Sequence, residues 1–167
     1  MINHKIKCSN FEIANDKPFT LIAGPCQLES EAHAMMMSTE LKKITNALGI
    51  NLIYKTSFDK ANRTSIKGKR GLGLDKSIPI FEKIKKEVGI PVLTDVHNAE
   101  QCSTISKYVD VLQIPAFLCR QTDLIIAAAK TGKIINVKKG QFLAPWDMAN
   151  VIKKIEDSGN KNILITE

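Results

Sequence analysis

One stretch near the middle of the chain carries the pattern that decides the fold. Residues 91–137 are PVLTDVHNAEQCSTISKYVDVLQIPAFLCRQTDLIIAAAKTGKIINV. Short apolar runs at 91–95, 110–114 and 134–137 alternate with two longer amphipathic segments. The apolar runs are continuous, which is typical of parallel strands that are covered on both faces. Strict alternation of strands and helices predicts a parallel α/β fold.

The same alternation continues in both directions from that stretch. Gly132 and Gly159 follow two of the helical segments, where helix ends favour glycine, and Pro145 lies in the first turn of the last segment. A strand–helix unit therefore repeats five times before a final strand. We expect strands at 19–23, 51–55, 91–95, 110–114, 134–137 and 162–166, and helices at 29–48, 75–88, 99–107, 122–130 and 145–157.

Two architectures fit this alternation: an open doubly wound sheet and an eight-stranded (β/α) barrel. The chain has neither G-x-G-x-x-G after its first strand nor G-x-x-x-x-G-K-[ST] anywhere, which weakens the nucleotide-binding open sheets and predicts no nucleotide cofactor. A complete barrel of the TIM type takes about 250 residues, so 167 residues supply about five and a half β/α units. We expect one domain over residues 1–167, an incomplete barrel, with a hairpin at residues 5–14 in an N-terminal cap over residues 1–18.

Composition narrows the classes of function. Apolar residues make up 44% of the chain and charged residues 25%, which is ordinary for a globular protein. No apolar run reaches the roughly 18 residues of a membrane span, and the first 15 residues lack the apolar core of a signal peptide. We therefore expect a cytoplasmic protein without a membrane partner. The four cysteines form no C-x-x-C pair and no zinc-finger spacing.

The net charge of +7 has three interpretations. A lysine-rich solvated surface is the simplest, and a basic nucleic-acid-binding module is a second. Aromatic residues make up only 5% of the chain and the basic residues are dispersed, which argues against a nucleic-acid interface. The third interpretation, a positive cleft for small anions, is favoured by where the polar residues fall.

Polar residues cluster just after the predicted strands. Lys55 ends the second strand, Lys60 and Arg63 follow it, and Lys138 follows the fifth. In both architectures the carboxyl ends of parallel strands share one face, so we expect these cations to meet at one mouth. Cations packed together repel one another unless anions offset them, and Arg and Lys suit phosphate and carboxylate groups. Asp95 is the lone acid among them, suited to binding a substrate hydroxyl or moving a proton.

Seven segments of the chain resemble the 3-deoxy-D-manno-octulosonate 8-phosphate synthase family. The resemblance covers essentially the whole chain, and the Lys-Ala-Asn-Arg segment at 60–63 is its specific part. The related synthase that makes the first sugar acid of the shikimate pathway shares the barrel and the donor but typically has Lys-Pro-Arg-Thr there, and it is the alternative. The resembling segments are 21–30, 55–65, 70–71, 94–97, 113–118, 120–123 and 136–139.

The resemblance implies a (β/α)₈ barrel, usually a homotetramer, and a defined reaction. Members of the family condense phosphoenolpyruvate with D-arabinose 5-phosphate and water, and they release inorganic phosphate. Their product is a precursor of the Kdo sugar of lipopolysaccharide. The donor has a carboxylate and a phosphate and the acceptor has a second phosphate, which matches the anions that the clustered cations require.

The resemblance also implies roles for the donor-binding residues. Lys55 and Lys60 face the phosphoenolpyruvate carboxylate, Lys138 faces its phosphate, and Gln113 lines the same pocket. Fixed cations stabilise the charge that develops on the donor as water adds and the C–O bond breaks. The residues implied to act in catalysis are Lys55, Lys60, Asn62, Asp95 and Lys138.

Further roles concern the pentose and the neighbouring subunit. By the same resemblance, Asn62, Arg63 and Thr64 hold the phosphate end of the pentose. Asp95 contacts the pentose hydroxyls, and Arg120 reaches into a neighbouring subunit's site. Holding the enol carbon next to the aldehyde supplies much of the rate through proximity.

Cys26 implies a metal by resemblance. The family has a metal-dependent branch with Cys at this position and a metal-free branch with Asn, so Cys26 implies a divalent ion: Fe, Zn, Mn or Co. The other ligands in the family, a His, a Glu and an Asp, come from later strands than this chain contains. We therefore expect these 167 residues to be a fragment that is inactive alone; an inactive remnant is a further alternative.

Overall fold

The computed structural model describes residues 4–167, which form two compact units. The first unit runs to Thr94, the second runs from Asp95 to Glu167, and each is described by itself. The single domain expected over residues 1–167 stays a prediction, and the first three residues of the expected cap lie outside the described residues. No helix within residues 4–167 has both the length and the hydropathy that crossing a bilayer requires.

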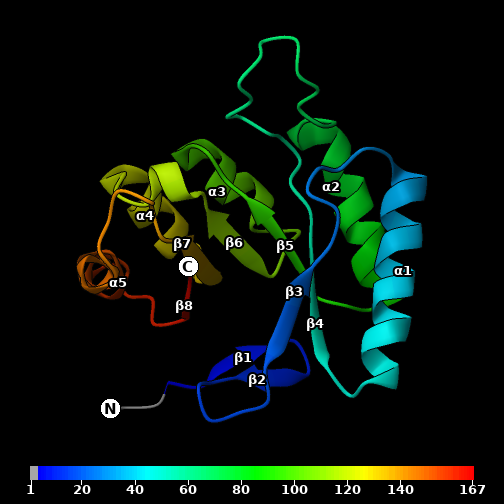
Figure 1. Cartoon of the computed structure of the whole chain (residues 1–167), viewed down its shortest axis with the longest axis horizontal. Helices are drawn as coiled ribbons and strands as arrows, with labels where there is room; N and C mark the ends of the chain where they lie inside the picture. The colour runs from blue at the N-terminus through cyan, green and yellow to red at the C-terminus, as the bar shows by residue number, and fades with distance from the viewer. Residues whose placement is uncertain (1–3) are drawn as a thin grey trace. The chain divides into compact units, whose positions relative to one another are not determined.

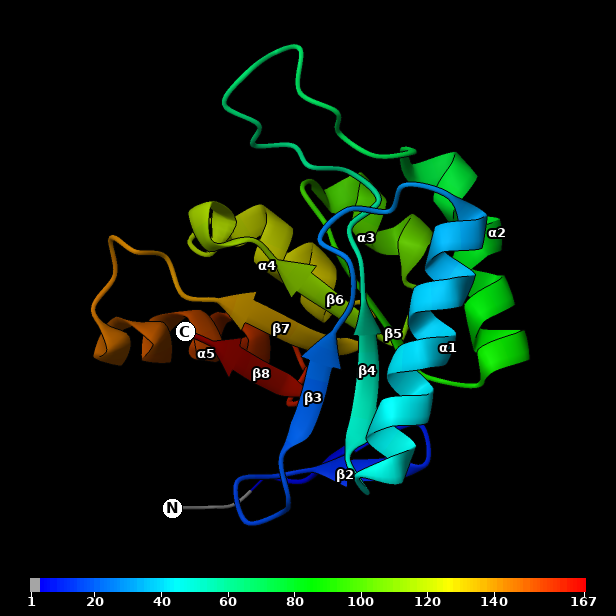
Figure 2. The ribbon, with the colours of Figure 1, turned by 45° about the vertical axis from the view of Figure 1, so that its right-hand side comes forward.

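The first unit begins with the expected antiparallel hairpin, which is confirmed. Strands β1 (Ile6–Cys8) and β2 (Phe11–Ile13) pair with Cys8 opposite Phe11. Ser9 takes the left-handed conformation in the turn, at φ 53°. Ile6 and Cys8 are buried. The hairpin lies at the amino ends of the strands that follow it (Figures 1 and 2).

Three parallel strands form the sheet of the first unit. They are β3 (Thr20–Ala23), β4 (Asn51–Lys55) and β5 (Val92–Asp95), whose last residue belongs to the second unit. Ile22 pairs with Ile53 between β3 and β4, and strand order follows chain order. The middle of β4 is buried, as the apolar run at 52–54 predicts.

Two helices of the first unit lie side by side against β3 and β4 (Figures 1 and 2). Helix α1 (Glu31–Ala47) begins after Ser30, whose side-chain oxygen accepts from the His33 backbone N–H at 3.2 Å, a standard N-cap. Helix α2 (Leu74–Lys83) continues as a π-helical turn (Ile84–Val88). That turn falls inside the helix expected at 75–88, and no feature of the hydrophobic period indicates it.

The second unit repeats the parallel strand–helix order. Its strands pair in register, with Gln113 opposite Asn136 and Lys138 opposite Thr166. Short 3-10 turns precede two of its helices, at Ala116–Leu118 and at Pro145–Asp147, so the helix expected at 145–157 begins with a tighter turn. The elements are α3 (Ala99–Ile105), β6 (Val111–Ile114), α4 (Thr122–Ala129), β7 (Ile134–Lys138), α5 (Met148–Asp157) and β8 (Ile163–Thr166).

The arrangement within each unit confirms the fold class. Each parallel strand lies next to the strand that precedes it in the chain, and a helix intervenes between each strand and the next. That order is the order of strands in a (β/α) barrel, and a doubly wound sheet would instead reverse its order at a switch point. The expected strands all occur, with bounds shifted by a residue at most.

Candidate functional site

A group of cations surrounds one buried hydroxyl at the carboxyl end of β4. Ser57 is fully buried, and its Oγ accepts from Lys55 Nζ at 3.1 Å and from Lys60 Nζ at 2.9 Å. Both lysines are half-buried. We call Lys55, Ser57 and Lys60 the lysine cluster. Two ammonium groups bonded to one oxygen repel each other by on the order of 3 kcal/mol at intermediate dielectric, so the cluster favours an anion.

The loop after β3 extends the sheet next to this cluster. The Ser57 backbone N–H donates to the Cys26 carbonyl at 3.4 Å, and the Leu28 N–H donates to the Ser57 carbonyl at 2.9 Å. Gly24 allows this approach, because a Cβ at Gly24 would lie 2.0 Å from the Lys55 carbonyl oxygen. The two strand ends are therefore held together by backbone contacts that only glycine permits at this point.

Cys26 is exposed, and the cations around it stabilise its thiolate. A hydrogen bond from Lys60 is the main cause that lowers the pKa of the Cys26 thiol. Burial opposes it, and the charges of Lys60, Lys55 and Arg63 lower the pKa further. Cys102 shows the opposite case, because burial raises the pKa of its thiol to about 11. Of these two thiols, only that of Cys26 is shifted toward the thiolate, which is the form that acts as a nucleophile or metal ligand.

The long loop between β4 and α2 is held by several polar contacts. Arg70 makes a two-point contact with the Asp59 carboxylate, with Nε at 2.7 Å from Oδ1 and Nη2 on Oδ2. The Lys60 backbone N–H donates to the Arg70 carbonyl at 2.7 Å. Position 71 of the same loop requires glycine, because a Cβ there would lie 2.6 Å from the Phe58 carbonyl oxygen. These contacts fix the segment from which Lys60 projects.

Arg63 joins the loop to the segment after β3. Its Nη2 donates to Gln27 Oε1 at 2.6 Å and its Nε donates to the Lys69 carbonyl at 2.8 Å. Asn62 and Thr64 flank it in the exposed part of the loop. The guanidinium is therefore held near the lysine cluster, while its neighbours face solvent and are open to a ligand.

A second polar group lies in the second unit, at the carboxyl ends of its strands. Gln113 Nε2 donates to Asp95 Oδ1. Asn136 Nδ2 donates to Gln113 Oε1 at 2.9 Å, and Thr166 Oγ1 donates to Asn136 Oδ1 at 2.9 Å. We call these four residues the polar ladder. Asp95, Gln113 and Asn136 are buried, so the ladder sits inside the unit with its hydrogen bonds made.

The remaining predicted residues of the second unit are more exposed. Lys138 is the last residue of β7, and it is exposed. The next lysine behaves differently: Lys139 Nζ lies 3.4 Å from a Glu167 carboxylate oxygen and bonds the Leu143 carbonyl at 3.1 Å. Arg120 is exposed and lines a cavity of about 350 Å³ with Asp147 and Lys154, among others.

The predicted site residues therefore fall into two groups. Cys26, Lys55, Lys60 and Arg63 come together in the first unit, and Asp95 comes together with Gln113 in the second. That Lys138 shares one mouth with Lys55 and Arg63 stays a prediction. Sequence reasoning gave no role to Ser57, Gln27, Asn136 or Thr166. The signal for Ser57 was its spacing, two residues after one lysine and three before another.

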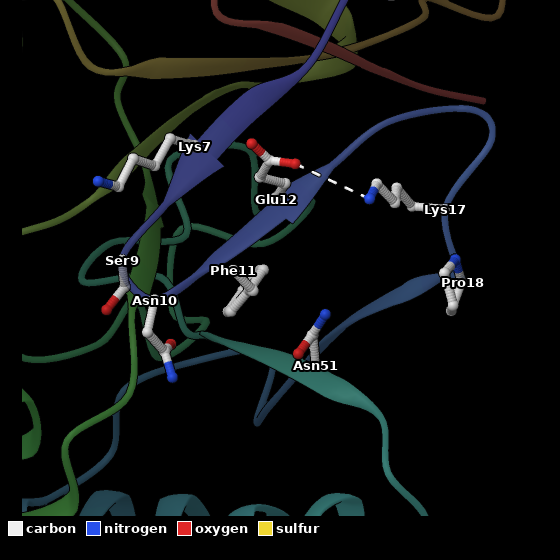
Figure 3. A pocket seen from close by; sticks show the side chains of 8 residues that line it. All are labelled: Lys7, Ser9, Asn10, Phe11, Glu12, Lys17, Pro18 and Asn51. Atoms are coloured by element: carbon white, nitrogen blue, oxygen red, sulfur yellow. Dashed lines mark ion pairs between the residues drawn. The ribbon is translucent and has the colours of Figure 1, made fainter.

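A further cavity lies at the other end of the first unit's strands. It measures about 550 Å³ and is lined mainly by the hairpin, together with Asn51 at the start of β4 (Figure 3). Lys17 and Glu12 form an exposed ion pair of 3.9 Å at its edge. Because the lysine cluster lies at the carboxyl end of β4, this cavity is separate from the candidate site.

The structure allows a test of the expected metal. The Cys26 thiolate suits a soft divalent ion, and Cys26 fits as one ligand. Within residues 4–167, however, no three His, Cys, Asp or Glu side chains gather in a way that could hold a metal. The charges of Lys60, Lys55 and Arg63 also favour the thiolate form of Cys26.

Comparison with known proteins gives one family. Residues 3–167 match the family model described as the DAHP synthetase I family. The chain is 62% identical over 165 residues to 2-dehydro-3-deoxyphosphooctonate aldolase of Brucella anthropi, and 61% identical over 165 residues to the proteins of that name from Brucella ovis and Brucella canis. Each alignment covers 99% of this chain and 60% of the relative, so the chain spans 60% of the length of these curated relatives.

Proposed function

Because the chain belongs to the DAHP synthetase I family, we propose that the protein containing it condenses phosphoenolpyruvate with a phosphorylated sugar and releases phosphate. We propose D-arabinose 5-phosphate as the sugar. The relatives are named for an eight-carbon phosphorylated sugar acid, and three donor carbons plus five acceptor carbons give eight. The enol carbon bonds to the aldehyde carbon, water adds to the neighbouring carbon, and phosphate leaves. The product would serve the synthesis of the Kdo sugar of lipopolysaccharide.

The observation that carries this proposal is the shared hydrogen bonding of Lys55 and Lys60 to Ser57. We assign the two ammonium groups to the donor carboxylate, which would offset their mutual repulsion. Half-burial strengthens such a charge-assisted contact relative to one in bulk water. As the C–O bond breaks, negative charge builds on the departing phosphate, and fixed cations at the site can stabilise it without reorganisation.

The other predicted residues take roles that stay proposals. Lys138 is assigned to the donor phosphate and Gln113 to the donor pocket. Arg63, with Asn62 and Thr64 on either side, is assigned to the acceptor phosphate, because a guanidinium suits phosphate oxygens. Asp95 is assigned to the acceptor hydroxyls, which donate to a carboxylate. We also propose a homotetramer in which Arg120 serves the neighbouring subunit's site.

A divalent metal enters the proposal only through Cys26. When bound, such an ion would act as a Lewis acid, and the thiolate of Cys26 would be one of its ligands. The Cys26→Asn variant distinguishes two roles of Cys26: a ligand of the metal, and a thiolate that is paired with Lys60 and binds no metal. If Cys26 binds the metal, a chelator lowers turnover of the unsubstituted protein and leaves the variant unaffected. Equal sensitivity of both proteins to the chelator would exclude the ligand role.

The experiment that tests the function follows phosphate release by the intact protein that carries this chain. We expect release from phosphoenolpyruvate only when arabinose 5-phosphate is present, and much slower release with erythrose 4-phosphate. The opposite preference would favour the alternative that the family description suggests, the shikimate-pathway synthase. No release with either sugar, together with steeply salt-dependent DNA or RNA binding, would favour the nucleic-acid-binding alternative. Failure to bind any of these ligands would indicate an inactive remnant.

We propose that the reaction takes place in the cytoplasm. Both substrates are phosphorylated anions, and the predicted anion-binding side chains lie at strand ends and in the loop after β4, where Asn62, Arg63 and Thr64 are exposed to water. Fractionation of cells followed by the phosphate-release assay tests this location. Activity that sediments with membranes would contradict it.

A further inference from the structure

The polar ladder is a hydrogen-bond chain with one direction. It begins at Thr166 on β8, passes through Asn136 on β7 and Gln113 on β6, and ends at Asp95. Register places Gln113 directly opposite Asn136. Thr166 lies two positions beyond Leu164, the partner of Asn136 on β8. A continuous chain of side-chain hydrogen bonds thus runs across β6, β7 and β8 to the end of β5, in addition to the backbone pairing of these strands.

The direction of the chain follows from what each group can do. An ionised carboxylate only accepts hydrogen bonds, so Gln113 must turn its NH₂ toward Asp95 and its carbonyl toward Asn136. Asn136 must then turn its NH₂ toward Gln113, and its carbonyl needs a donor. The Thr166 hydroxyl is that donor, at 2.9 Å. Both amide orientations are therefore determined by their neighbours.

Stability alone does not require this arrangement. Asn136 is 1% exposed and Gln113 6% exposed, and each lies among apolar strand residues. Replacing both members of a buried hydrogen bond by apolar groups of the same shape is often nearly neutral for stability. The ladder instead fixes the direction in which Gln113 presents its donor to Asp95, and thus holds the carboxylate in one orientation.

We propose that Asn136 and Thr166 are positioning residues that act through Gln113 on the Asp95 carboxylate. This inference rests on the proposed function, in which Asp95 binds the hydroxyls of the acceptor sugar. With the ladder intact, one carboxylate oxygen is occupied by Gln113 and the carboxylate has one orientation. Thr166, three strands away from Asp95, then determines the orientation in which the Asp95 carboxylate accepts a hydrogen bond from the sugar hydroxyl.

The first test replaces the end of the ladder in the intact protein. Thr166→Val keeps the shape and removes the donor, leaving the Asn136 carbonyl without it. We expect KM for arabinose 5-phosphate to rise about tenfold, in line with the loss of one buried hydrogen bond. Thr166→Ser restores the hydroxyl and should restore KM to within about twofold. The dissociation constant of phosphoenolpyruvate should change little, because Lys55 and Lys60 do not depend on the ladder.

The second test reverses the middle of the ladder. Asn136→Asp keeps the size of the side chain but cannot donate to Gln113, so the Gln113 NH₂ is drawn away from Asp95. We expect a larger rise in KM for arabinose 5-phosphate than in Thr166→Val. Asn162→Asp adds the same charge at the exposed residue just before β8 and should leave KM unchanged, which controls for charge.

The outcomes separate this inference from the proposed function. If the unsubstituted protein releases no phosphate from the two substrates, the proposed function fails and the inference fails with it. If the unsubstituted protein is active and folded Thr166→Val has an unchanged KM for arabinose 5-phosphate, only the inference fails. The inference also fails if Thr166→Ser is as impaired as Thr166→Val, because shape rather than the hydroxyl would then be responsible.

Discussion

Lys55 and Lys60 donate to the same acceptor, with their Nζ atoms 3.1 Å and 2.9 Å from Ser57 Oγ. The chain leaves β4 after Lys55, and the turn that follows brings a side chain five positions later back to the same point. A buried hydroxyl thus holds two half-buried ammonium groups in place before any ligand arrives. Such preorganised charge costs no rearrangement when an anion binds.

Removing the shared acceptor should weaken donor binding. In the intact protein, Ser57→Ala leaves both ammonium groups without this hydroxyl, so their positions are less defined. We expect the KM for phosphoenolpyruvate to rise at least about tenfold, because hydrogen bonds to charged groups contribute more than neutral ones. Ser65→Ala, in the exposed part of the same loop, is the matched control. Equal KM values in the two variants would show that Ser57 does not order the lysines.

The contact between Arg70 and Asp59 should keep the loop after β4 closed to proteases. Asp59→Asn removes the charge and weakens the two-point contact, so the loop should open more often and trypsin should cut after its Lys and Arg residues several-fold faster. Thermal stability should hardly change, because exposed ion pairs contribute little. Glu31→Gln breaks the exposed Lys83–Glu31 pair in the same unit and should not affect cleavage of the loop. Equal cleavage rates in both variants would contradict this role.

Cys26 should react with alkylating agents at a lower pH than an ordinary thiol. The thiolate is the reactive form, and the hydrogen bond from Lys60 lowers the pKa of Cys26, so the rate of modification should reach its plateau at a lower pH. Lys60→Ala removes the main cause and should move that plateau to higher pH. Rates measured against pH by mass spectrometry, with chelator present, test this. An unshifted profile in Lys60→Ala, compared with Lys69→Ala, would contradict it.

Gly24 should be the least replaceable glycine beneath the lysine cluster. In Gly24→Ala the new Cβ would meet the Lys55 carbonyl 2.0 Å away, and the backbone there must shift. We expect the free energy of unfolding in urea to fall by more than about 2 kcal/mol. Gly159→Ala has open space around it and should lose only about 1 kcal/mol from its positive φ. If Gly24→Ala loses no more free energy of unfolding than Gly159→Ala, the backbone around Gly24 accommodates a Cβ easily and the prediction is wrong.

The fold was accessible from the sequence because its signals are local. Short apolar runs such as 52–54 and 111–112 mark buried parallel strands, and Gly49, Gly89 and Gly132 end helices with positive φ. The π-helical turn at the end of α2 has no such signal, because its sequence fits an ordinary helix equally well.

The candidate site was accessible only in part. The positions of Lys55, Lys60 and Asp95 follow from the strands that precede them. The hydrogen-bond partners of these side chains cannot be predicted in this way, because the contacts of Ser57 and Asn136 depend on side-chain orientation and strand register. Gln27 and Arg63 are 36 residues apart in the chain, and no local pattern joins them. Long-range hydrogen bonds of this kind appear only once the strands are paired.

The measurement that tests the central claim most directly is the affinity of the intact protein for phosphoenolpyruvate, determined by calorimetric titration. If the lysine cluster binds the donor carboxylate, Lys60→Ala should weaken binding about 30-fold or more, since a half-buried charge-assisted contact is lost. Lys69→Ala, which removes an exposed lysine of the same loop, should bind as the unsubstituted protein does. Equal affinity in Lys60→Ala and Lys69→Ala would contradict the assignment of the lysine cluster to the donor.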